Sequence, residues 1–151
     1  MNRDLSDFRV NYDLKKLLET DCPSNPFELF TQWFQDAEQS TDVLEPNAMT
    51  LATANKQGIP SARIVLLKSY DNKGFVFFTN YNSKKALELF ENPHASLVFL
   101  WKALHRQVRI KGSVEKLDRQ HSEEYFKSRP RNSQIGAWVS QQSQILKNRD
   151  E

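Results

Sequence analysis

The feature that most constrains the fold is a series of short β-type segments between residues 48 and 117. Five segments are rich in β-branched and aromatic residues and are separated by short turns or helical inserts: 48–54, 61–70, 75–79, 95–101 and 106–117. Gly58 and Gly74 lie in two of the turns, where glycine can adopt a positive φ. We expect an antiparallel small barrel or sandwich, because closure removes exposed strand edges.

Helices are expected before and between these strands. Asn25 can cap a helix in which Pro26 takes the first position, and apolar residues then recur at spacings of three and four. Ser83 can cap a short helix ending near residue 90, and Asp118 another ending near residue 128. The chain is therefore expected to be mainly β, of the α+β class. We assign residues 1–24 to an N-terminal arm, 25–143 to one domain and 144–151 to the start of a truncated C-terminal region.

Composition excludes several classes of function. The formal charge of +2 gives no general attraction to nucleic acid or to a membrane surface, so an anion site must be local. The single cysteine, the polar N-terminus and the lack of a long apolar run predict a cytoplasmic protein. The three histidines are far apart in sequence and lack metal-ligand spacing, so no metal site is expected.

Two segments could hold an anion near the middle of the chain. In the segment 80–85, a helix N-terminus, a hydroxyl group and two lysines (Lys84 and Lys85) converge, although both lysines could equally be solvated surface. Arg63 and Lys68 stand at the two ends of an apolar strand. Their parity places them on opposite faces unless a bulge intervenes, and both could simply flank the buried part of the strand.

A third candidate lies near the C-terminal end. Tyr125 and Arg129 are four residues apart, which predicts one helical face, and Ser133 follows a proline turn. Phenol, guanidinium and hydroxyl groups could then converge on a phosphate. Alternatively, Arg129 only complements a helix C-terminus and Ser133 only caps the next turn.

Taken in order, these segments resemble the pyridoxamine 5′-phosphate oxidase family from about residue 8 to residue 143. The match is close at 63–68, at 106–108 and above all at 125–138, where SRPRNSQIGAW is similar to the family signature. The resemblance implies an FMN-binding split β-barrel, antiparallel and Greek-key-like with flanking helices. It also implies a homodimer with FMN at the subunit interface.

The resemblance also implies two sets of binding residues. The positions that would contact FMN are Arg63, Ile64, Val65, Leu66, Leu67, Lys68, Phe78, Thr79, Lys84, Lys85, Gln107, Gln142 and Ser143. Those that would hold the vitamin B6 substrate are Arg9, Tyr12, Lys68, Tyr125, Arg129 and Ser133. Phe78 stands where the family commonly has tyrosine, and Lys84 where it commonly has arginine.

The implied reaction is oxidation of pyridoxamine or pyridoxine 5′-phosphate to pyridoxal 5′-phosphate, with oxygen as acceptor. No side chain is assigned as catalytic, because the flavin performs the redox chemistry and the protein orients the reactants. In the family a later segment supplies a tryptophan and an Arg-x-His-x-Arg pattern, and nothing after Ser143 matches them. We therefore expect the 151-residue chain to bind FMN weakly and to turn over little.

Two rival functions stay open. A non-catalytic flavin-binding or B6-phosphate-binding protein would keep the fold without the oxidase activity. A small barrel that binds nucleic acid would instead use a basic strip, and the balanced charge argues against it. The strip would contain Lys84, Lys85, Arg106, Arg109 and Lys111.

Overall fold

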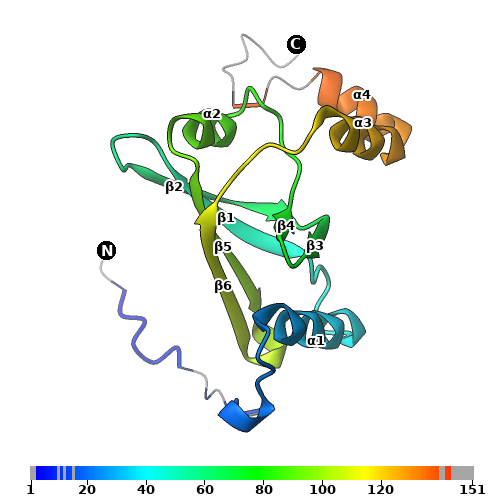
Figure 1. Ribbon diagram of the computed structural model, residues 1–151. Helices are drawn as coiled ribbons and strands as arrows, with labels where there is room; N and C mark the ends of the chain where they lie inside the picture. Colours follow the sequence, from blue (N-terminus) through cyan, green and yellow to red (C-terminus); the bar gives the residue numbers. More distant parts are fainter. Residues whose placement is uncertain (1–2, 10, 12, 15, 140–141, 144–151) are drawn as a thin grey trace. The chain divides into compact units, whose positions relative to one another are not determined.

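The computed structural model of the protein describes residues 3–9, 11, 13–14, 16–139 and 142–143 (Figure 1). Its contacts divide the chain into two compact units. The first comprises Met1–Pro46 and Leu100–Val108, and the second Asn47–Phe99 and Arg109–Glu151. Each unit is described by itself below.

The first unit is organised around helix α1 (Pro26–Gln39), which follows the 3-10 turn η1 (Glu19–Asp21). The backbone N–H of Phe27 donates to Asn25 Oδ1 at 3.0 Å, which confirms the predicted cap. Phe30 and Ala37 of the expected apolar stripe are buried, and the Phe30 ring lies 6.1 Å from that of Trp101. The segment after Trp101 forms a second 3-10 turn, η2 (Lys102–Leu104).

The second unit contains most of an antiparallel sheet. Strand β1 (Ala48–Ala54) pairs with β2 (Pro60–Leu66) and also with β5 (His94–Trp101), and β6 (Arg106–Ser113) completes the order β2-β1-β5-β6. A hairpin of β3 (Ser69–Asp71) and β4 (Gly74–Val76) forms a separate two-stranded sheet between β2 and β5 in sequence. The predicted antiparallel, Greek-key-like α+β fold is confirmed, because β5 returns to β1 across this excursion.

The prediction of one continuous strand over 61–70 is wrong. The backbone N–H of Leu67 donates to Asn47 O at 2.8 Å, whereas that of Lys68 donates to Val76 O at 2.8 Å. The chain therefore leaves its partner β1 and joins β4 at this point, with the Leu67 side chain buried. Because of this break, the alternation of side chains along one strand no longer determines whether Arg63 and Lys68 lie on the same face.

Other element boundaries also differ from expectation. The strands predicted at 75–79 and 106–117 end at Val76 and Ser113, and a fourth helix, α4 (Arg131–Val139), was not assigned. Helices α2 (Lys84–Glu91) and α3 (Arg119–Ser128) begin where they were predicted. Among the described residues, no helix is both long enough and apolar enough to cross a membrane.

The register of β1 and β2 decides which side chains share the buried face of the sheet. Leu51 lies opposite Arg63, and Thr53 lies opposite Ser61. Residues directly opposite each other in an antiparallel pair project to the same face. Leu51 and Thr53 are buried, so the register turns the polar groups of Ser61 and Arg63 toward the interior side of the sheet.

Candidate functional site

The first part of the site is the N-terminus of α2. Ser83 occupies the N-cap position, but its hydroxyl donates to Asn80 O at 2.6 Å, so the predicted side-chain cap is wrong. The Thr79 hydroxyl lies 3.4 Å from that of Ser83. The positive end of a helix and two hydroxyl groups therefore meet here, which favours an anion.

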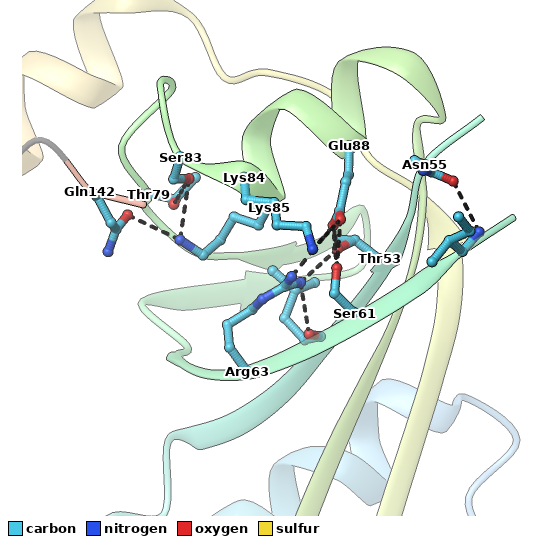
Figure 2. A network of polar contacts seen from close by, with 12 residues as sticks. Thr53, Asn55, Ser61, Arg63, Thr79, Ser83, Lys84, Lys85, Glu88 and Gln142 are labelled. Atoms are coloured by element: carbon cyan, nitrogen blue, oxygen red, sulfur yellow. Dashed lines mark hydrogen bonds and ion pairs between the residues drawn. The ribbon is translucent and has the colours of Figure 1, made fainter. Parts of the chain in front are cut away.

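Lys85, the second residue of α2, turns its side chain inward. Its Nζ donates to Ser83 Oγ at 3.2 Å and to Gln142 Oε1 at 3.0 Å (Figure 2). Burial lowers the pKa of Lys85, and the positive charge of Arg63 lowers it further. A buried cation next to a second cation is an unfavourable arrangement that a bound anion would relieve.

A buried carboxylate, Glu88, lies one turn further along α2. It accepts hydrogen bonds from the hydroxyls of Thr53 at 2.5 Å and Ser61 at 2.6 Å. Burial acts to raise the pKa of Glu88, but these hydroxyls together with the charges of Arg63 and Lys84 outweigh it, and the net pKa is lowered. Glu88 is therefore held in its charged form.

Arg63 connects the carboxylate to the sheet. Its Nη1 donates to Leu51 O at 3.2 Å and to Thr53 Oγ1 at 2.6 Å, and its Nη2 lies 3.4 Å from Glu88 Oε2. We call the following residues the phosphate cluster: Thr53, Ser61, Arg63, Lys84, Lys85 and Glu88. Figure 2 shows their side chains gathered between α2 and strands β1 and β2.

Three members of the phosphate cluster were not predicted as site residues. Thr53, Ser61 and Glu88 belong to no recognised motif. In a sequence, a glutamate that stands near lysines is expected to be an ordinary solvent-exposed residue. One signal was present, because Glu88 follows Lys84 by four residues and such pairs interact on a helix. The burial of Glu88 depends on the strand register, which the sequence does not show directly.

An aromatic cluster, comprising Lys68, Phe78 and Tyr125, forms the second part of the site. The rings of Phe78 and Tyr125 stack with centroids 3.8 Å apart and an interplanar angle of 4°. Lys68 Nζ lies 5.8 Å from the centroid of the Tyr125 ring. The break after Leu66 thus brings Lys68 to α3, and a cation lies beside a phenol.

The expected helical face of Tyr125 and Arg129 does not form. Helix α3 ends at Ser128, and Arg129 is its C-cap with an extended backbone (φ −73°, ψ 146°), because Pro130 follows. Ser133 lies inside α4, and the side chain of Gln134 bridges back to Arg129 O at 2.9 Å. The structure shows no hydrogen bond that joins Tyr125, Arg129 and Ser133, all of which it describes.

The remaining predicted positions belong to both units. Ile64, Val65 and Leu66 lie on β2, with Ile64 65% exposed on the side away from Arg63. Gln107 on β6 and Arg9 are exposed residues of the first unit, whereas Ser143 is exposed in the second with φ 67°. Tyr12 lies outside the described residues. Within the described part of the chain, no group of three acidic, histidine or cysteine residues could hold a metal ion.

Comparison with known proteins points to one family. A family model described as Pyridoxamine 5'-phosphate oxidase matches residues 36–151. The chain is 54% identical over 150 residues to a pyridoxine/pyridoxamine 5′-phosphate oxidase of Trichormus variabilis, covering 99% of this chain and 70% of that protein. It is also 54% identical to the protein of the same name from Bordetella pertussis, over 97% of this chain and 69% of that one.

Two solved structures share the fold. PhzG from Burkholderia lata, in complex with tetrahydrophenazine-1-carboxylic acid, has a TM-score of 0.82 and 29% identity, covering 89% of this chain and 67% of that chain. A pyridoxamine 5′-phosphate oxidase-related, FMN binding protein from Nostoc punctiforme has a TM-score of 0.63 and 15% identity, covering 84% and 70%. Because its identity is only 15%, the second structure supports the fold and nothing further.

Proposed function

The chain belongs to the pyridoxamine 5′-phosphate oxidase family, and on this premise we propose that it is an FMN-dependent oxidase of pyridoxamine or pyridoxine 5′-phosphate. The product is pyridoxal 5′-phosphate and oxygen is the acceptor. The observation that carries the proposal is the buried Lys85 beside Arg63 at the N-terminus of α2, since this arrangement fits a phosphate ester.

The residues present fit a flavin phosphate. Arg63, Lys84 and Lys85 supply cationic donors, and Thr79 lies beside the N-cap of α2. Gln142 reaches the same place through its hydrogen bond to Lys85. We assign the phosphate group of FMN to this set. When bound, the flavin supplies the acceptor of the two electrons removed from the substrate.

The aromatic cluster is assigned to the substrate phosphate. Lys68 and Tyr125 offer an ammonium group and a phenol, and Arg129 and Ser133 follow on the same α3–α4 segment. The task of these side chains is to hold and orient the substrate, while no acid or base among them is required to act. The Phe78 ring supports Tyr125 by stacking on it.

We propose that the protein acts as a homodimer, as the family resemblance implies. Supporting this, Ile64 is 65% exposed on the sheet face opposite Arg63, and Ile59 before β2 is 62% exposed. Large exposed aliphatic side chains on a sheet face favour association. Sedimentation analysis of the protein and of Ile64→Glu would test this, and a monomeric wild-type protein with bound FMN would contradict it.

The central experiment is reconstitution followed by assay. The purified protein is titrated with FMN while its absorbance spectrum is recorded, and pyridoxal 5′-phosphate formation from pyridoxamine 5′-phosphate is then measured. We expect FMN to bind with a shifted visible spectrum. For a polypeptide of residues 1–151 alone, we expect turnover below that of a relative such as the Trichormus variabilis protein, because the chain covers 70% of that protein.

Each outcome of that experiment separates the candidate functions. A yellow protein that forms pyridoxal 5′-phosphate supports the oxidase. A yellow protein that binds pyridoxal 5′-phosphate without any turnover, even when tested at long times, favours the non-catalytic binding protein. A protein that binds neither FMN nor pyridoxal 5′-phosphate would contradict both.

A further inference from the structure

Glu88 is a buried carboxylate that lies near two cations, Arg63 and Lys84, and the proposed function gives it no role. We propose that Glu88 is a positioning residue for the flavin phosphate, holding Arg63 and Lys84 together before the ligand binds. This inference rests on the proposed function, because it assumes that the phosphate cluster receives FMN. Glu88 itself would not contact the reacting atoms.

The first support is the way in which the carboxylate is fixed. Thr53 on β1 and Ser61 on β2 donate to it at 2.5 and 2.6 Å, and Glu88 itself is 6% exposed. Short hydroxyl–carboxylate bonds from two paired strands define the position of the group. The carboxylate is therefore anchored by the sheet and does not depend on the cations for its position.

The second support is the weakness of its contacts with the cations. Arg63 approaches Glu88 through one nitrogen at 3.4 Å, and Lys84 approaches it at 3.8 Å. A carboxylate that neutralised Arg63 would form a short, bidentate pair with it. For comparison, the N–O distance in the exposed pair of Arg119 with Glu123 is 2.6 Å. Glu88 thus attracts the cations without occupying all of their donors, which leaves donors for a ligand.

The third support is the balance of charge. Arg63, Lys84 and Lys85 with one carboxylate leave a formal excess of two positive charges in the phosphate cluster. A phosphate monoester carries a charge of about −1.5 to −2 at neutral pH. Without Glu88, the cations would repel one another in the ligand-free protein, and the exposed Lys84 would be free to turn into solvent.

The test compares FMN with riboflavin, which lacks the phosphate. Quenching of flavin fluorescence gives both affinities for the wild-type protein, Glu88→Gln and Glu88→Ala. For Glu88→Ala we expect the FMN affinity to fall about tenfold, by analogy with the loss of other supporting partners of a binding group. Riboflavin affinity should change less than about twofold, because the phosphate cluster does not recognise the ring.

Two further variants complete the design. Glu88→Gln keeps the hydrogen-bonding oxygen but loses the charge, so its FMN affinity should lie between those of Glu88→Ala and the wild type. Glu91→Gln removes an equal charge from an exposed position of the same helix and should leave both affinities unchanged. Should the Glu88 variants fail to fold, Ser61→Ala removes one anchoring hydroxyl and should lower FMN affinity about threefold without affecting riboflavin.

Three results would overturn the inference. Equal losses of FMN and riboflavin affinity would show that Glu88 serves the fold only. Tighter FMN binding by Glu88→Gln would show that the carboxylate competes with the phosphate. Unchanged affinities would show that it has no part in binding. If the wild-type protein does not prefer FMN to riboflavin, the proposed function itself fails, which is a separate outcome.

Discussion

The phosphate cluster and the aromatic cluster are built in different ways. The phosphate cluster combines side chains from two paired strands and from α2, and hydrogen bonds of 2.5 to 2.6 Å join its members Thr53, Ser61, Arg63 and Glu88. The aromatic cluster depends on α3, and neither α3 nor α4 contains a buried residue. The Tyr125 ring on α3 stacks on Phe78, and Lys68 Nζ lies 5.8 Å from its centroid.

This difference indicates whether each cluster is already formed before the ligand proposed for it binds. The strand register fixes Thr53, Ser61 and Arg63, and Glu88 is hydrogen-bonded to the first two, so this part of the phosphate cluster is formed once α2 packs on the sheet. The aromatic cluster lies on an exposed helix, where local opening costs less than in the sheet. On the proposed function, the cofactor would therefore bind to a preformed site, whereas substrate binding would order the α3–α4 segment further.

The largest effect is expected from breaking the phosphate cluster at Arg63. Arg63→Met leaves Glu88 buried without its nearest cation, so the free energy of unfolding of the ligand-free protein should fall by about 2 kcal/mol. Urea denaturation measures this change. As a control, Arg119→Met removes an exposed ion pair and should change the free energy of unfolding far less than Arg63→Met does. Similar losses in the two variants would contradict the comparison.

The next effect separates the two lysines of α2. Lys85→Met removes a buried cation whose pKa is lowered by burial, so FMN affinity should fall about tenfold or more while the ligand-free protein is not destabilised. The Lys84 side chain is 69% exposed, so its charge is screened by solvent. Lys84→Met should therefore lower the affinity for FMN by only about threefold. Isothermal titration with FMN provides both values. A larger loss for Lys84→Met would reverse the assignment.

A smaller effect is expected in the aromatic cluster. Phe78→Leu removes the stacking partner of Tyr125 and should lower the free energy of unfolding by about 1 kcal/mol. Tyr125→Phe keeps the stack, so its thermal transition should match the wild type while its affinity for pyridoxal 5′-phosphate falls. Differential scanning calorimetry and equilibrium dialysis measure the two quantities. If Tyr125→Phe binds pyridoxal 5′-phosphate normally, the phenol does not hold the substrate.

Local patterns in the sequence predicted most of the elements but not how the strands connect. The caps at Asn25 and Asp118 were correct because capping depends on residues within one turn. The break after Leu66 was missed because an apolar run such as 63–67 does not reveal where a strand changes partner. Helix α4 was not assigned, since its apolar residues lack a clear helical period.

The candidate site was predictable to the extent that single residues carry a motif. Lys85 and Gln142 were both expected at the cofactor site and are joined by a hydrogen bond. Glu88 was missed, because a buried carboxylate is defined by partners 27 and 35 residues away. The helical pairing of Tyr125 with Arg129 failed because Pro130 forces the preceding residue out of the helix.

Stability should depend on pH in opposite senses at the phosphate cluster and at α3, because the pKa of Lys85 is lowered and that of His121 is raised. Burial lowers the pKa of Lys85 below 10.5, so the unfolded state binds more protons between that lowered pKa and 10.5. Stability of the ligand-free protein should therefore rise with pH through this alkaline window. His121 on α3 behaves conversely, since its hydrogen bond and charge pairing with Asp118 raise its pKa above 6.5.

The contribution of His121 is complete below pH 6.5 and is lost as the pH rises through the raised pKa. Both partners are exposed, so this is the smallest of the expected effects and is best seen as a difference between variants. The midpoint of thermal unfolding, measured from pH 5.5 to 10.5 so that both windows are covered, should decline slightly less across the neutral range in His121→Gln than in the wild type. Lys85→Met should lose the alkaline gain and keep the neutral decline. A neutral decline that disappears in Lys85→Met would instead tie both titrations to the phosphate cluster, and the two regions would then not be independent.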